Sequence, residues 1–358
     1  MFFIDLRLHQ KIFLVQTWIK GCSMLKPLIL TASLLSSMSA LASSVINNQQ
    51  VEQQKSCFSG RFETYAIWRG MIENKIKRRM TEPQKISQRM KVFDARFDEE
   101  QFNTFKAKLE CTNFKYKVDG NDVWGFVIKP KGSVQLLPTL IYNRGGNGNF
   151  GSVVFGAMMA NLFPISEQGF VIIGSQYRGT FTKDDNLDQF GGEDVNDVLA
   201  LFDLIPYVNG ADTNRIGMFG ASRGGMQTHL VANQAPSIKA IATIAGIADL
   251  RAGLEIRANM EKVYENRIPN YAQNKDQELA KRSVLNWVNT LPKNRPILLI
   301  HGGKDKRVSV THTENLAAAL KEYKIPHKLI LYPEDNHFLD ISKSQADAEI
   351  VSWFKAHL

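Results

Sequence analysis

Ser222 lies in the sequence Gly220-Ala221-Ser222-Arg223-Gly224, which fits the pattern G-x-S-x-G. A short apolar run, residues 215–219, precedes it, and residues 225–233 have a helical pattern. Between a strand and a helix, this pattern forms a turn so tight that the serine hydroxyl projects from the sheet edge, where a base can reach it. The five-residue pattern alone is modest evidence for a nucleophile. Its position between an expected strand and an expected helix makes the evidence stronger. We therefore expect Ser222 to be a nucleophile.

Two further residues follow in the order that such a serine requires. Serine, acid and histidine, each just past a strand, meet at one edge of a sheet. Residues 296–301 and 328–332 are rich in β-forming residues, and Asp305 and His337 lie in the turns after them. We expect His337 to take the proton from Ser222 and Asp305 to hold the imidazole in the correct tautomer. In the structural alternative, Asp305 caps the coming helix and His337 is an ordinary loop residue.

Other histidines and one other aspartate compete for these roles. His301 lies before Asp305, at the end of the strand, so its order is wrong and a structural role is expected. His229, in the helix after the expected nucleophile, and His327, at the start of a strand, fit packing or surface positions better. Asp249 follows an apolar strand and is an alternative acid, ranked below Asp305.

An oxyanion hole should lie beside the serine. Acyl transfer places negative charge on a carbonyl oxygen, and fixed backbone N–H groups stabilise that charge. One donor should be the N–H of Arg223, the residue after the nucleophile. The second should come from the loop after the strand at 139–142, through Arg144 or Gly145, and Gly145 is favoured. Whether the Arg144 side chain contacts the substrate or pairs with an acid stays open.

These motifs together resemble the catalytic domain of the prolyl oligopeptidase family, which has an α/β-hydrolase fold. Its serine, aspartate and histidine motifs are similar to GASRGG (220–225), HGGKDKRVSV (301–310) and DNHF (335–338). The likeness continues upstream in YNRGG (142–146), SQYRGT (175–180) and FGGEDVNDV (190–198). Arg144 departs from the pattern, because relatives often have His or Tyr there. The resemblance covers about residues 113–358.

The resemblance implies a serine hydrolase that works through an acyl-enzyme intermediate, most simply a peptidase. A carboxylesterase of the same fold, acting on small esters, is the first alternative. A non-catalytic hydrolase-fold protein that binds a ligand or partner is the second, although such proteins usually lack one member of the triad. Longer members of the family carry a β-propeller before the hydrolase domain. Residues 43–112 are too few for a propeller, which needs at least four blades of about 40 to 50 residues.

Cofactor and metal sites are not expected. Residues 146–151 spell G-x-G-x-x-G after a strand, a pattern that occurs in dinucleotide sites. Such a site needs an acidic residue at the end of the second strand, where this chain has Gln176 and Tyr177. The cysteines and histidines do not have the spacing of a metal site.

Strands and helices alternate through most of the chain, which predicts an α/β fold with a mostly parallel sheet covered on both faces. A hairpin is expected around residues 119–122. A helical insert at about 249–292 is expected either to roof the active site or to protect a sheet edge.

Residues 43–112 are expected to form a helical segment, which covers the sheet or offers a partner surface. Acidic residues near 193–197 suit a helix N-terminus and are expected to be structural. The expected strands are 138–143, 170–175, 215–219, 239–245, 296–301 and 327–332.

Residues 1–42 are interpreted as an upstream extension and a signal peptide that begins at Met24. An apolar core at 28–35 precedes a small-residue site that ends at Ala42. We expect cleavage after Ala42 and export to a periplasm or the cell exterior. Stable membrane insertion is not expected afterwards, because the apolar run is shorter than the roughly 18 residues of a membrane span.

Charge and cysteine usage add two expectations. The net charge of +9 falls to about +6 without residues 1–42, and the densest basic run is 75–79. That run lies on a helical pattern without interleaved aromatic residues, which favours a solvated face over a nucleic-acid site. Cys57 and Cys111 remain after cleavage, as a disulfide or as buried thiols. The oligomeric state cannot be predicted from these patterns.

Overall fold

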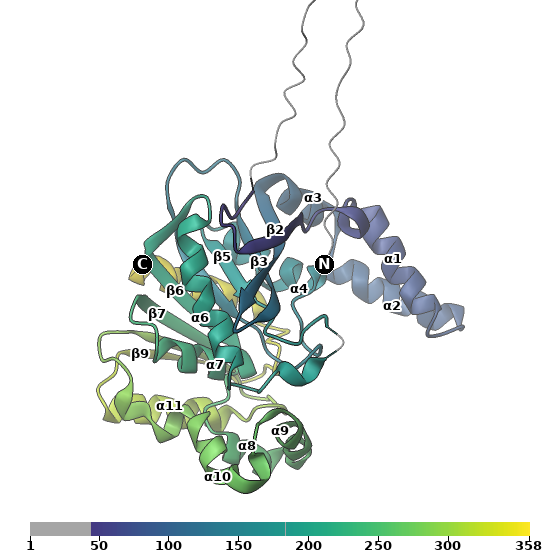
Figure 1. Ribbon diagram of the computed structural model, residues 1–358. Coiled ribbons are helices and arrows are strands. Elements are labelled where there is room, and N and C mark those ends of the chain that lie inside the picture. Colours follow the sequence, from purple (N-terminus) through teal and green to yellow (C-terminus); the bar gives the residue numbers. More distant parts are fainter. Residues whose placement is uncertain (1–43, 183) are drawn as a thin grey trace, which may run out of the picture. The chain divides into compact units, whose positions relative to one another are not determined.

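The computed structural model describes residues 44–182 and 184–358, so the predicted signal peptide and its cleavage site lie outside the described residues. Residues 44–358 form one compact unit. Its nine strands form a single sheet in the order β1-β2-β3-β5-β4-β6-β7-β8-β9 (Figure 1). The strands are β1 Val51–Ser56, β2 Leu109–Val118, β3 Asn121–Pro130, β4 Leu137–Asn143, β5 Val171–Ser175, β6 Ala211–Ala221, β7 Ile238–Ile244, β8 Ile297–Gly302 and β9 His327–Tyr332.

Six strands, β5, β4, β6, β7, β8 and β9, are parallel. Helices cover both faces of this part, and for that reason strands such as β5 and β8 are buried along their whole length and are mostly apolar. The helices are α1 Tyr65–Lys77, α2 Pro83–Arg96, α3 Glu99–Lys108, α4 Phe155–Asn161, α5 Phe163–Ser166, α6 Asp194–Leu204, α7 Arg223–Ala232, α8 Leu250–Ile256, α9 Glu261–Arg267, α10 Tyr271–Lys281, α11 Val310–Glu322 and α12 Lys343–His357. The predicted mostly parallel α/β fold is confirmed.

Two apolar cores lie on the two faces of the sheet. One contains residues of α6, α7 and α11, such as Leu201, Val231 and Leu320. The other contains residues of α3, α4, α5 and α12, such as Phe102 and Phe354. The sheet is therefore the middle of three layers, and its strand ends are held from both sides.

The first three strands are antiparallel. β2 and β3 form the predicted hairpin around Asp119 and Gly120. β1 was not predicted, because its sequence VEQQKS is mostly polar. It pairs with β2 at the edge of the sheet, with a shift in register between Glu52 and Lys55 and a positive φ of 53° at Gln53.

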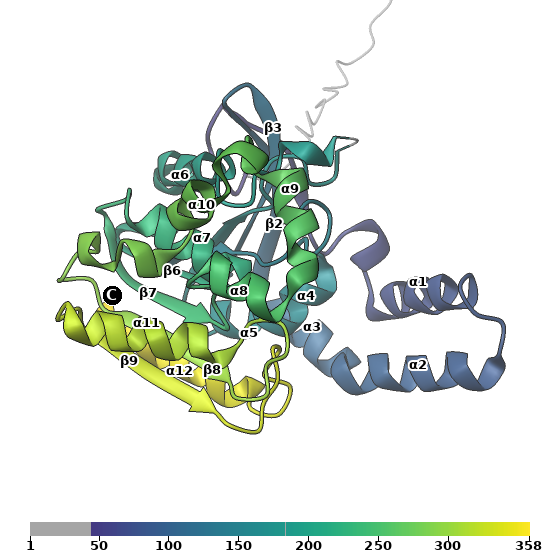
Figure 2. The ribbon, with the colours of Figure 1, turned by 90° about the horizontal axis from the view of Figure 1, so that it is seen from below.

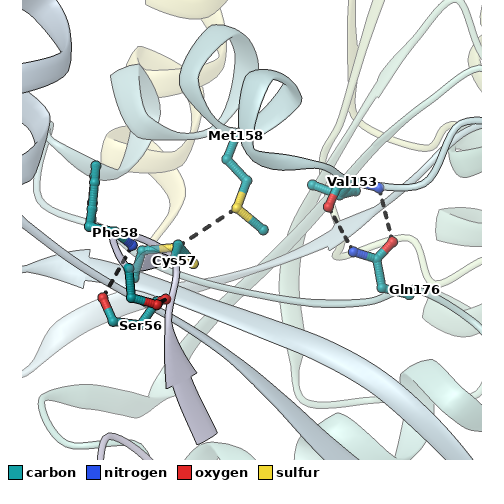
Figure 3. Close-up of a disulfide and its surroundings, with 8 residues drawn as sticks. Ser56, Cys57, Phe58, Val153, Met158 and Gln176 are labelled. Atoms are coloured by element: carbon teal, nitrogen blue, oxygen red, sulfur yellow. Dashed lines mark hydrogen bonds between the residues drawn. A yellow bond between two sulfur atoms is a disulfide. The ribbon is translucent and has the colours of Figure 1, made fainter. Parts of the chain in front are cut away.

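A disulfide joins Cys57, just after β1, to Cys111 in β2 (Figure 3). It lies against α4, where Sδ of Met158 is 3.7 Å from Sγ of Cys111. Of the two states left open by the sequence, the structure has the disulfide. Beside it, the Gln176 amide makes two hydrogen bonds with the backbone of Val153 and so fixes the start of α4 to the end of β5.

Helices α8, α9 and α10 form the predicted insert between β7 and β8 and lie together in both views (Figures 1 and 2). A small core of their own, with Tyr264, Tyr271 and Leu279, packs on Phe190. Helices α1 and α2 form a hairpin whose far end extends away from the sheet (Figures 1 and 2). Among the described residues, no helix combines the length and hydropathy needed to span a bilayer.

Candidate active site

Ser222 occupies a tight turn between β6 and α7, with φ 58° and ψ −124°. A non-glycine residue in such a conformation costs roughly 1–3 kcal/mol, so its surroundings must hold it. Its N–H donates to the carbonyl of Ile244 at 2.8 Å. A Cβ on Gly224 would lie 2.0 Å from the carbonyl oxygen of Asn143, so only glycine lets α7 begin this close to β4. The turn predicted from G-x-S-x-G is present.

Asp305 and His337 lie in the loops that follow β8 and β9, and their side chains are in contact. Nδ1 of His337 is 2.6 Å from Oδ2 of Asp305. Oδ1 of the same carboxylate accepts the N–H groups of Arg307 and Val308 at 2.7 and 3.0 Å. Burial acts to raise the pKa of Asp305, but the hydrogen bonds from His301, His337 and the backbone hold the pKa well below its ordinary value. The carboxylate is therefore ionised and fixed in orientation.

His301 contacts Asp305, a contact that its place in the sequence does not predict. Its Nε2 is 3.1 Å from Oδ2 of Asp305 and 3.0 Å from the carbonyl of Val308, and its Nδ1 is 2.6 Å from the Thr313 hydroxyl. These contacts fit an imidazole that accepts from Thr313 and donates toward Asp305. His301 is thus structural, as expected, but it also orients the carboxylate that contacts His337. A histidine at the end of a strand, four residues before the acid, was the available signal.

Ser222 and His337 both line a cavity of about 870 Å³. Its floor includes Tyr142 and Phe219 from the sheet, and the insert supplies Met260, Val263 and Tyr264. Of the two roles considered for the insert, the structure shows that it forms part of the cavity wall. Phe150 and Phe338 complete the apolar lining near the mouth, where both are more than half exposed.

Two of the expected oxyanion donors lie beside Ser222. Gly145 and Arg223 line the same cavity, and a Cβ on Gly145 would lie 3.3 Å from Cβ of Ser222. Arg223 is the first residue of α7, so its N–H has no acceptor within the helix and lies at the positive end of the helix dipole.

The Arg144 side chain has neither of the two roles left open by the sequence. It is fully buried, and its guanidinium donates to the carbonyls of Gln176, Gly145, Phe150 and Gly148 and to the Thr180 hydroxyl. Burial, together with the charge of the nearby Arg223, lowers the pKa of Arg144 to about 10. Arg144 therefore remains charged at neutral pH and holds the loop that carries Gly145 in place.

The Arg223 side chain also has a structural role. It is 1% exposed and pairs with Asp188 and Asp194 at 2.7 Å. It donates to the carbonyl of Gly146 at 2.9 Å as well. Asp194 further accepts backbone N–H groups of Gly191 and Gly192. Arg223, the residue after Ser222, thus ties both neighbouring loops to the turn.

The competing residues lie in other surroundings. Asp249 accepts the N–H groups of Arg251 and Ala252 and so caps α8. Nδ1 of His327 contacts the carbonyl of Ile325. His229 is buried within α7, and neither ring nitrogen has a partner among the described residues. Burial lowers the pKa of His229 to about 4, so the ring is neutral at neutral pH.

The glycines of residues 146–151 are explained by a tight turn. Gly146 has φ 73°, and a Cβ there would lie 2.1 Å from the carbonyl oxygen of Phe150. The loop folds onto itself and lines the cavity beside Ser222. Within the described part of the chain, no group of three or more His, Cys, Asp or Glu side chains could hold a metal ion.

The architecture and the tight turn define the α/β-hydrolase class. Residues 157–358 match the model of the prolyl oligopeptidase family, and the chain belongs to that family. It is 28% identical over 242 residues to a Bacillus subtilis protein named uncharacterized peptidase YtmA. The matched region covers 67% of this chain and 91% of that protein. It is 27% identical to acylamino-acid-releasing enzyme 1 of Oryza sativa, over 62% of this chain and 30% of that protein.

Solved structures agree on the fold. The acylaminoacyl peptidase of Pyrococcus horikoshii matches with a TM-score of 0.61 and 20% identity, over 72% of this chain and 43% of that one. A puromycin-hydrolyzing peptidase of Mycobacterium tuberculosis matches with a TM-score of 0.58 and 20% identity, over 69% and 39%. The chain thus spans most of YtmA but less than half the length of these longer relatives.

Proposed function

We propose that this protein is a serine peptidase that uses Ser222, His337 and Asp305 as its catalytic residues. The observation that carries the proposal is the 2.6 Å contact between His337 and Asp305 beside a cavity that both His337 and Ser222 line. The family and the peptidases among its relatives favour this activity over that of a carboxylesterase.

In this mechanism, Nε2 of His337 accepts the proton of the Ser222 hydroxyl as the oxygen attacks the substrate carbonyl carbon. Asp305 holds Nδ1 protonated and stabilises the imidazolium. The N–H groups of Gly145 and Arg223 stabilise the oxyanion. His337 then protonates the leaving amine, and a water molecule hydrolyses the acyl-enzyme by the same steps in reverse.

The cavity wall favours substrates without a free amino terminus near the scissile bond. Lys343 and Asp347 in the wall neutralise each other as an ion pair. Arg257 and Arg307 add two guanidinium groups to the lining. A protonated α-amine close to them is repelled, whereas an acylated amine or a neutral acyl group is not. We therefore propose short, N-terminally blocked peptides as the preferred class.

We also propose that the protein is exported. The disulfide between Cys57 and Cys111 supports this location, because disulfides persist in oxidising compartments. The signal peptide at residues 24–42 remains a prediction, and determining the N-terminus of the purified chain by intact mass tests it. A mature chain that retains Met1 or Met24 contradicts it.

Labelling with a fluorophosphonate tests the proposed chemistry. Wild-type protein should label, and Ser222→Ala should not. Rates on blocked peptide p-nitroanilides, their unblocked counterparts and p-nitrophenyl acyl esters then separate the substrate classes. Cleavage of esters alone would retire the peptidase assignment. An unlabelled, folded wild type would favour the non-catalytic binding protein instead.

A further inference from the structure

The hairpin of α1 and α2 is an arm that projects from the body (Figure 2). At its base, the Trp68 and Phe155 rings pack with centroids 4.9 Å apart. Arg69 joins the two helices through two 2.8 Å hydrogen bonds to the Asp94 carboxylate. These contacts join the two helices to each other and their base to α4.

The arm carries the whole charge surplus of the described molecule. Residues 61–96 contain ten Lys or Arg and four Asp or Glu, a net charge of +6. The rest of residues 44–358 is balanced, with 30 of each sign. Several exposed cations of the arm take part in no ion pair within the described residues, namely Arg61, Lys75, Arg78, Arg79, Arg89 and Lys91.

An apolar groove of about 1080 Å³ lies between the arm and the start of α4. Its lining includes Phe62, Trp68 and Phe155, and Lys75, Arg78 and Arg79 also border it. Ile67 in this groove is 47% exposed, and Val92 on α2 is 64% exposed. The arm therefore offers apolar side chains and unpaired cations together, which is the composition of a segment that binds at a membrane surface.

The positive charge of the arm favours an anionic lipid surface over residues 1–42 or a second copy of the chain. Residues 1–42 contain four basic side chains and one acidic one, so their charge does not complement that of the arm. A second copy offers only an equally basic arm or a balanced body. An anionic lipid surface supplies negative headgroups for the cations and an acyl boundary for the apolar side chains. A projecting arm also reaches a flat surface without the body in the way.

We propose that the α1–α2 arm binds the protein to anionic phospholipid bilayers. The protein lies on the surface and does not cross it. Lys75, Arg78 and Arg79 contact phosphate groups, while Ile67 enters the headgroup boundary. Binding through the arm then keeps the body, with the cavity of Ser222, next to the surface of the bilayer.

Co-sedimentation of the full chain with vesicles tests the proposal. Vesicles of phosphatidylethanolamine and phosphatidylglycerol should bind the protein, phosphatidylcholine vesicles should not, and added salt should release it. Each cation at such a surface contributes roughly fivefold to partitioning, so Lys75/Arg78/Arg79→Gln should weaken binding about 100-fold. Ile67→Ser should weaken binding about fivefold without a change of charge.

The matched control is Lys293/Lys321/Lys355→Gln, which removes three exposed body cations and should bind like wild type. All variants share residues 1–43, so any contribution of that segment cancels. Thermal melting checks that each variant is folded. Equal loss in the arm and body variants would overturn the proposal, because net charge alone would then explain binding. Absence of binding to anionic vesicles would also overturn it and favour an acidic protein partner.

Discussion

Around Ser222, charged side chains are buried and paired, whereas in the α1–α2 arm they are exposed and in surplus. Arg223 is 1% exposed and contacts two carboxylates, while Arg78 and Arg79 are exposed and enter no ion pair in the described part of the chain. Buried charges cannot be removed singly without leaving a partner uncompensated. Exposed charges contribute little to stability and remain free for a partner. The same residue type therefore fixes the loops around Ser222 in one region and, in our proposal, supplies a binding surface in the other.

The largest expected effect is on catalysis and concerns a buried charge near Ser222. Asp305→Asn should lower kcat/KM by about 10⁴-fold, because the amide favours the wrong tautomer of His337. Asp249→Asn, which changes the competing acid at the cap of α8, should retain activity within a few-fold. Steady-state rates on one blocked peptide substrate measure both. Comparable losses in the two variants would contradict the assignment of the acid.

Substitution of a buried, paired arginine should lower the free energy of unfolding much more than substitution of an exposed arginine on the arm. Arg223→Gln leaves Asp188 and Asp194 without their buried cation and should cost about 3–5 kcal/mol of unfolding free energy. Arg79→Gln on the arm should change the free energy by less than about 0.5 kcal/mol. Denaturant titration of both variants measures the difference. If Arg79→Gln were as costly as Arg223→Gln, the arm would have a structural charge network.

The smallest expected effect concerns His229 and pH. Burial lowers its pKa to about 4, so between that value and the unfolded pKa of about 6.5 only the unfolded chain binds the proton. Stability due to this residue is thus present above the unfolded pKa and is lost as the pH falls through the window. From pH 7 to about pH 5, wild type should lose about 2 kcal/mol more than His229→Leu. Parallel stability curves in denaturant titrations would contradict this.

The predictable parts of the molecule were those encoded locally. Strands such as β5 and β8 are short, mostly apolar runs, and Gly224 is required where α7 approaches β4, so both fold and turn could be recognised. Strand β1 was missed, because its polar residues pair at an exposed edge and carry no apolar alternation.

Long-range contacts were the other unpredictable part. The ion pairs of Arg223 join residues 29 and 35 positions apart, and the five acceptors of Arg144 lie in two separate loops. The contact of His301 with Asp305 follows from a turn whose geometry the residue types do not specify. Chain order was enough to predict that Asp305 and His337 lie together, but not to predict the residues that orient them.

The irregular strand β1 has a consequence for self-association. An exposed sheet edge is a template on which another chain can add a strand and start aggregation. Here the edge is short and polar, and the positive φ at Gln53 interrupts its ladder between Glu52 and Lys55. An incoming strand cannot keep its hydrogen bonds past this break, so the sheet terminates at β1 instead of growing from one molecule into the next.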